Sequence, residues 1–110
     1  MELIIDSKFD AQNNNWQIEI NGEVDLFNSA EMKAKLLSLL DEKPADLIIN
    51  CANLDYIDST ALGALVAVLK NAKEYGCDIY LKNIKHNIEK LFKITNLDKV
   101  FNIEGDENEQ

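Results

Sequence analysis

One short apolar run constrains the fold more than any other feature of the sequence. Leu47, Ile48, Ile49 and Cys51 form a nearly continuous apolar stretch with polar residues on both sides. Such a run is typical of a central strand that is covered on at least one face and lies parallel to a neighbour. Pro44, just before it, ends a preceding helix because proline cannot donate a backbone hydrogen bond. The run therefore predicts an α/β domain built around this strand.

The chain before this strand predicts a hairpin followed by a helix. Residues 3–5 are apolar, and residues 16–20 alternate apolar and polar side chains as a half-buried strand does. The Asn-rich residues 10–15 predict a turn, so the two strands should pair as a hairpin. Asn28, with Glu31 three residues later, predicts a helix N-terminus with a capping box. The apolar face of this helix comprises Met32, Leu36, Leu39 and Leu40.

The chain after the central strand predicts two more helices and two more strands. Residues 52–58 should form a loop, and a helix should run from Ser59 to about Tyr75, where Gly76 ends it. Residues 77–81 alternate as a strand. The third helix and the last strand are marked by Ile88, Leu91, Phe92 and Thr95 and by Val100, Phe101 and Ile103. This order predicts a mixed four- or five-stranded sheet packed with three main helices.

The length and composition predict a single cytoplasmic domain. Of the 110 residues, we expect residues 1–104 to form the domain and residues 105–110 to be an acidic, frayed tail. No apolar stretch approaches the roughly 20 residues that cross a bilayer, and the N-terminus lacks a signal-peptide pattern, so membrane insertion is not expected. Cys51 and Cys77 belong to no CxxC pair, which favours two buried thiols in a reducing cytoplasm over a disulfide or a metal site.

The charge of the chain excludes several classes of function. The 20 acidic residues outnumber the 11 basic ones, which gives a formal net charge of −9 and repels nucleic acid. All basic residues are lysines, so the chain cannot supply an arginine finger for phosphoryl transfer. If phosphate chemistry occurs, this chain should receive the group rather than transfer it. We expect no enzymatic activity, no cofactor and no metal site.

Ser59 is the strongest candidate for a functional residue. It stands at the predicted helix start, where its hydroxyl can cap the amide of Leu62 and where unpaired amides favour negative charge. Capping alone is the simpler interpretation. The helix, however, has one face directed at the sheet, with Leu62, Leu65, Val66 and Leu69, and one small, largely uncharged face, with Thr60, Gly63, Ala64, Ala67 and Asn71. The small face suits either a close protein partner or packing within the fold.

A phosphate on Ser59 would act mainly on binding. It adds a charge of about −1.5 to −2. At a helix N-terminus this charge is favourable by about 0.3–1 kcal/mol, so the fold should survive. In an interface the phosphate would lose its hydration and would be repelled by Asp58, Asp55 and Asp25. Phosphorylation is therefore expected to switch partner binding off.

Three segments resemble the STAS domains of bacterial anti-sigma factor antagonists. Residues 56–63, YIDSTALG, resemble the family's phosphorylation-site signature, in which Asp, Ser, then Ser or Thr, Gly, Leu, Gly is usual. Residues 22–25, GEVD, look like its Gly-Glu-Leu-Asp turn, and residues 95–101, TNLDKVF, resemble its C-terminal segment. Ala61 stands where the family usually has glycine, and its methyl group would alter kinase recognition if it faced a kinase.

This resemblance implies a STAS fold and a role in the regulation of transcription. In the family, an anti-sigma factor that is an ATP-dependent serine kinase phosphorylates the residue matching Ser59, and a metal-dependent serine phosphatase removes the phosphate. The unphosphorylated protein binds the anti-sigma factor and releases a sigma factor. By resemblance and from the helix face, partner contacts are expected at Asp25, Asp58, Thr60, Gly63, Ala64 and Ala67.

Other interpretations are weaker. Thr60 competes as the phosphate acceptor, but the matching residue is the first hydroxyl after the aspartate. Catalysis by Ser59 would need a base, and nothing places the only histidine, His86, against it. Aspartate phosphorylation at Asp55 lacks the acidic pair that usually follows the first strand. A STAS accessory subunit of a transporter, or a stress-signalling scaffold, keeps the fold, but the intact Asp58-Ser59-Thr60 favours a switch.

Overall fold

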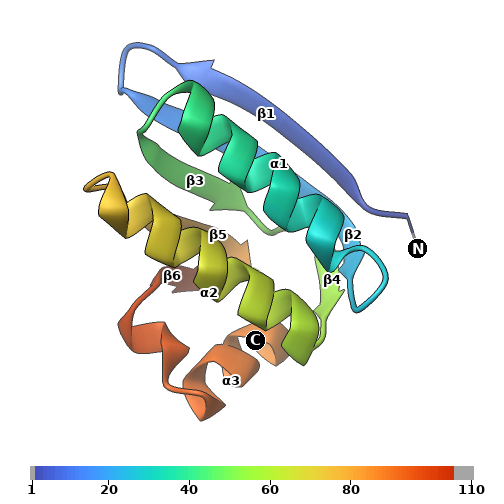
Figure 1. Ribbon diagram of the computed structural model, residues 1–110. Helices are drawn as coiled ribbons and strands as arrows, with labels where there is room; N and C mark the ends of the chain where they lie inside the picture. Colours follow the sequence, from blue (N-terminus) through green and yellow to red (C-terminus); the bar gives the residue numbers. More distant parts are fainter. Residues whose placement is uncertain (1, 106–110) are drawn as a thin grey trace.

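The computed structural model describes residues 2–105 as a mixed β-sheet with helices packed on one of its faces (Figure 1). In chain order the elements are β1 (Ile4–Asp10), β2 (Asn15–Val24), α1 (Ser29–Glu42), β3 (Asp46–Asn50), β4 (Leu54–Ile57), α2 (Ser59–Glu74), β5 (Ile79–Ile84), α3 (His86–Ile94), the 3₁₀ helix η1 (Leu97–Lys99) and β6 (Asn102–Gly105). Within these residues no helix combines the length and the apolar composition that crossing a membrane requires.

The sheet confirms the predicted hairpin and the predicted central strand. The main strand order is β1-β2-β3-β5-β6; β1 is antiparallel to β2, and the other neighbours along this path are parallel. The sheet is thus mixed, as expected, with five strands on this path. β3, the apolar run, lies between β2 and β5. Gly105, the first residue of the predicted tail, ends β6, and residues 106–110 lie outside the described residues.

The prediction of a loop at residues 52–58 is wrong, because this segment contains β4, a strand in addition to the five on the main path. β4 pairs in parallel with the end of β2, from Gly22 to Val24, and the register shifts between Gly22 and Glu23. Leu54 and Ile57 are both buried although they are three positions apart. The two-residue alternation that identifies a flat strand is therefore absent from this segment.

The core lies between the sheet and the helices. Strand residues of one face are buried against α1, α2 and α3, among them Trp16, Ile18, Ile20, Leu47, Ile49, Ile79 and Leu81. The other face is more polar, with exposed Glu19, half-buried Asn50 and an ion pair of 3.0 Å between Lys82 and Glu104. The central strand is therefore covered by helices on one face only.

The capping box predicted at the start of α1 is wrong, although α1 begins where expected. Asn28 occupies the N-cap position but makes no side-chain cap hydrogen bond. Its Oδ1 accepts from the amide of Asp25 at 2.8 Å, and its Nδ2 donates to the carbonyl of Glu23 at 2.9 Å. The side chain closes the β2–α1 loop instead of capping the helix.

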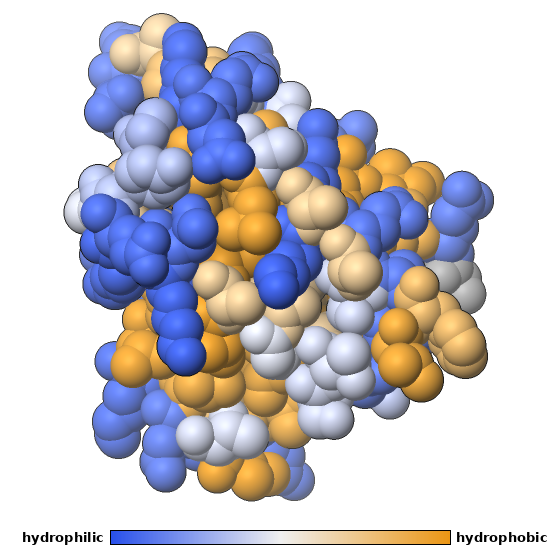
Figure 2. Space-filling model, viewed as in Figure 1, coloured by the Kyte–Doolittle hydropathy of each residue, from blue (hydrophilic) through white to orange (hydrophobic). Residues whose placement is uncertain are grey.

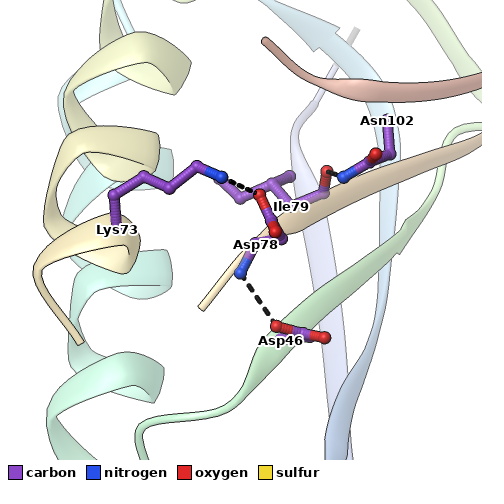
Figure 3. Close-up of polar contacts among 5 residues, drawn as sticks. All are labelled: Asp46, Lys73, Asp78, Ile79 and Asn102. Carbon is purple, nitrogen blue, oxygen red and sulfur yellow. Dashed lines mark hydrogen bonds and ion pairs between the residues drawn. The ribbon is translucent and has the colours of Figure 1, made fainter. Parts of the chain in front are cut away.

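Polar contacts fix the end of α2 and the start of β5 (Figure 3). Asp46 accepts a hydrogen bond of 2.8 Å from the amide of Asp78, whose carboxylate pairs with Lys73. Asn102 donates to the carbonyl of Ile79 at 3.2 Å and so ties β6 to β5. These contacts stand at the amino ends of β3 and β5, the edge of the sheet opposite to Ser59, and their role is structural.

The two cysteines are buried free thiols, as predicted. Burial raises the pKa of the Cys51 thiol to about 12, so this thiol is protonated and unreactive at neutral pH. Burial is also the main cause of the raised pKa of Cys77.

Candidate functional site

Ser59 is the first residue of α2, directly after β4 and Asp58, and it is exposed. The N-terminal ends of α1 and α2 lie next to each other, beside the loop that joins β2 to α1 (Figure 1). This is the edge of the sheet at which the parallel strands end. The structure thus places Ser59 where functional groups of α/β proteins commonly collect.

Asp58, not Ser59, caps α2, so the capping role predicted for Ser59 is wrong. One carboxylate oxygen of Asp58, Oδ1, accepts a hydrogen bond of 2.9 Å from the amide of Ala61. The other, Oδ2, accepts one of 2.9 Å from the amide of Leu26 in the β2–α1 loop. A single carboxylate therefore holds both the start of α2 and the neighbouring loop, and the hydroxyl of Ser59 is not needed for the cap.

The loop between β2 and α1 carries two exposed apolar side chains that were not predicted from the sequence. Leu26 is 65% exposed and Phe27 is 91% exposed. Asp25 is half-buried, and its Oδ1 accepts a hydrogen bond of 2.9 Å from the amide of Phe27. The predicted partner residue Asp25 thus shapes this loop. The only indication of this exposed pair in the sequence is that the two large apolar residues fit no helical or strand periodicity.

An open hollow of about 290 Å³ separates the first turns of α1 and α2. Three of the predicted partner residues, Thr60, Gly63 and Ala64, line it together with Ser29, Ala30 and Lys33. A methyl group added at Gly63 would meet nothing beyond its own helix within 4 Å, so close packing inside the chain does not require this glycine. The space on this face is free for a partner.

The remaining residues of the small face are not all part of this hollow. Ala67, one turn further along α2, is half-buried and lies outside the hollow's lining. Val66, predicted to face the sheet, is half-buried against the core and also lines a second hollow with Leu97 and Val100. The buried face of α2 comprises the predicted Leu62, Leu65 and Leu69 and, in addition, Ala61, Val68 and Ala72.

Charges around Ser59 are more balanced than predicted. Asp55 forms an ion pair with Lys85, so its negative charge is compensated. Lys33 adds a positive charge at the hollow. The N-terminal amides of α1 and α2 also favour an anion. This arrangement can accept a phosphate on the Ser59 hydroxyl without unfolding the helix.

Ala61, the one position of residues 56–63 noted above as differing from the resembling signature, is completely buried, with 0% of the residue exposed. Its methyl group therefore lies inside the fold and adds nothing to the outer surface. Among residues 2–105 no cluster of three or more His, Cys, Asp or Glu side chains is arranged to hold a metal ion.

We expect Asp58→Ala to lower the free energy of unfolding by about 1–3 kcal/mol. The change removes an N-cap and leaves the Leu26 amide without its acceptor. Urea denaturation measures the loss. Glu31→Ala, an exposed acid in the first turn of α1, is the matched control and should change stability by about 0.5 kcal/mol or less. Equal stability of the two variants would contradict the cap assignment.

The sequence is similar to known proteins over nearly its whole length. The sequence model of the STAS domain matches residues 8–110. An anti-sigma-B factor antagonist of Bacillus subtilis strain 168 is 34% identical over 103 residues, which cover 94% of this chain and 92% of the relative.

Solved structures show the same fold. A candidate anti-sigma factor antagonist from Thermotoga maritima superimposes with a TM-score of 0.82 at 22% identity, over 91% of this chain and 85% of the other. The phosphorylated form of SpoIIAA, a Bacillus cell fate determinant, gives a TM-score of 0.71 at 17% identity, over 96% and 94% of the two chains. At these identities the likeness concerns the fold alone.

Proposed function

Because this chain belongs to the STAS-domain family of anti-sigma factor antagonists, we propose that it is an anti-sigma factor antagonist controlled by phosphorylation of Ser59. The observation that carries this proposal is the position of Ser59: it is exposed at the start of α2, while Asp58 supplies the cap. The Ser59 hydroxyl is therefore available to another protein.

In the unphosphorylated form, the surface around Ser59 binds an anti-sigma factor and a sigma factor is released. Thr60, Gly63 and Ala64 present small, uncharged side chains at an open hollow, so a partner backbone can approach α2 there without removing a charged side chain of α2 from water. Asp25 and Asp58 act by shaping the loop and the helix start beside this surface. Ala67, half-buried further along α2, extends the same helix face.

Phosphorylation ends this association without unfolding the protein. The anti-sigma factor, acting as a serine kinase, transfers the γ-phosphoryl group of ATP to the Ser59 oxygen, and ADP and a proton are released. A metal-dependent phosphatase hydrolyses the phosphoester and releases inorganic phosphate. This chain is the acceptor and not a catalyst, and these partners act in the cytoplasm, where transcription takes place.

The test is to incubate the protein with ATP and each anti-sigma factor kinase of its source organism, purified. Mass spectrometry should find one phosphate per chain on the peptide that contains Ser59. Ser59→Ala should abolish the modification, and the matched control Thr60→Ala should retain it. Phosphate on Thr60, or no phosphate with any of the kinases, would overturn the proposal.

A further inference from the structure

We infer that Leu26 and Phe27, here called the Leu26–Phe27 anchor, insert into an apolar recess of the anti-sigma factor. This inference rests on the proposed function and adds a second, uncharged part to the docking surface. Phosphorylation of Ser59 would act on one part of the interface, while the anchor would supply affinity and selectivity through the other.

The exposure of the anchor is the first observation. Phe27 is 91% exposed, the highest value among the exposed large hydrophobic residues described, and Leu26 is 65% exposed. Figure 2 shows this apolar surface projecting where Figure 1 places the β2–α1 loop. Apolar side chains next to each other and rimmed by polar residues are typical of interaction sites.

The second observation is that the loop backbone is held in one conformation. The Leu26 amide donates a hydrogen bond to the carboxylate of Asp58, and the Phe27 amide donates one to the carboxylate of Asp25, each with a length of 2.9 Å. Asn28 bridges the Asp25 amide and the Glu23 carbonyl. A loop fixed in advance loses little backbone freedom on binding, so more of the contact energy appears as affinity.

The third observation is the continuity of the anchor with the Ser59 surface. The Asp58 carboxylate that holds Leu26 also caps the first turn of α2, next to Ser59. A protein that docks on Ser59 therefore reaches the loop as well. Because the anchor projects, the matching surface must be concave and apolar, and aromatic side chains in such recesses commonly dominate binding energy.

Other occupants fit less well. An anionic membrane surface would repel a chain with a net charge of −9. Within residues 2–105, a second copy could offer only the hollow at Val66, Leu97 and Val100, because the hollow beside the loop contains Lys33, Ser29 and Thr60. The loop of one copy in that hollow of another would be a head-to-tail contact, which builds rings or open filaments and not a closed dimer. The anti-sigma factor that contacts Ser59 is the occupant that the position of the anchor favours.

The experiment titrates the kinase that phosphorylates Ser59 with wild-type protein, L26S/F27S, Phe27→Ser and Phe27→Tyr, in the presence of ADP so that no phosphate is transferred. L26S/F27S and Phe27→Ser should raise the dissociation constant about tenfold or more. Phe27→Tyr, which keeps the ring, should bind within about threefold of wild type. The matched control is Ile94→Ser, which removes a 70% exposed apolar side chain at the end of α3. It should leave affinity within about twofold.

The outcomes separate the two proposals. If wild type binds and phosphorylation releases it, but L26S/F27S binds as tightly as Ile94→Ser, the anchor is wrong and the proposed function stands. If wild type binds none of the kinases, the proposed function and the anchor are both contradicted. All substituted side chains are exposed, so equal melting temperatures should establish that the variants are folded.

Discussion

The Ser59→Asp variant is expected to bind the anti-sigma factor at least tenfold more weakly than wild type, and phosphorylated wild type more weakly still. The carboxylate adds one charge, whereas the phosphate adds about −1.5 to −2, and both must lose hydration in the interface. A tenfold loss needs only about 1.4 kcal/mol, which a partly desolvated charge readily supplies. Ser59→Ala should bind like wild type but should not be released by ATP.

Isothermal titration of the purified partner, again with ADP, measures these affinities. Ser38→Asp is the matched control, because it places the same charge at an exposed serine in the second half of α1, away from the Ser59 surface. That control should bind within about twofold of wild type. Indistinguishable dissociation constants for wild type, Ser59→Asp and the phosphoprotein would refute the switch.

The largest stability effect is expected for Gly22→Ala, which should lower the free energy of unfolding by about 2–5 kcal/mol. Gly22 has a φ of +107°, a region that side chains other than glycine rarely adopt. An added Cβ would lie 2.2 Å from the backbone oxygen of Glu2, so the chain before β1 would have to move. Gly22 also donates a hydrogen bond of 2.9 Å to Asn53 where β2 meets β4.

Urea denaturation of Gly22→Ala should be compared with that of Gly63→Ala. Gly63 lies in an exposed part of α2, and its added methyl group meets nothing beyond its own helix within 4 Å. Because alanine favours a helix over glycine by about 1 kcal/mol, Gly63→Ala should stabilise the protein slightly. A loss below about 1 kcal/mol for Gly22→Ala would show that the segment before β1 adapts easily.

Periodicity was enough to predict the elements that make regular contacts. The hairpin, the central strand and the three main helices follow from alternation, apolar faces and end signals such as Gly76. The position of Ser59 at a helix start followed from the same pattern, whereas its exposure is shown by the structure. These features depend on residues that are close in sequence, so the patterns that predict them can be recognised in one sequence.

The features that were missed depend on distant contacts. β4 is a strand because it pairs with the end of β2, from Gly22 to Val24, and no pattern within residues 52–58 reveals this distant pairing. Asp58 and Ser59 both carry side-chain oxygens suited to capping. The residue at which β4 ends determines which of the two becomes the N-cap of α2. Similarly, the exposure of Phe27 is set by hydrogen bonds from its loop to Asp25 and Asp58.

Asp58 and Ser59 have separate roles, and this has a consequence for the timing of a signal. Since Asp58 stabilises the helix start and the loop, Ser59 can gain or lose a modification with no folding step to complete. The rate of the response would then be set by the enzymes that add and remove the phosphate. Older molecules could be reused through many rounds, so the cell could reset its transcription programme without new protein synthesis.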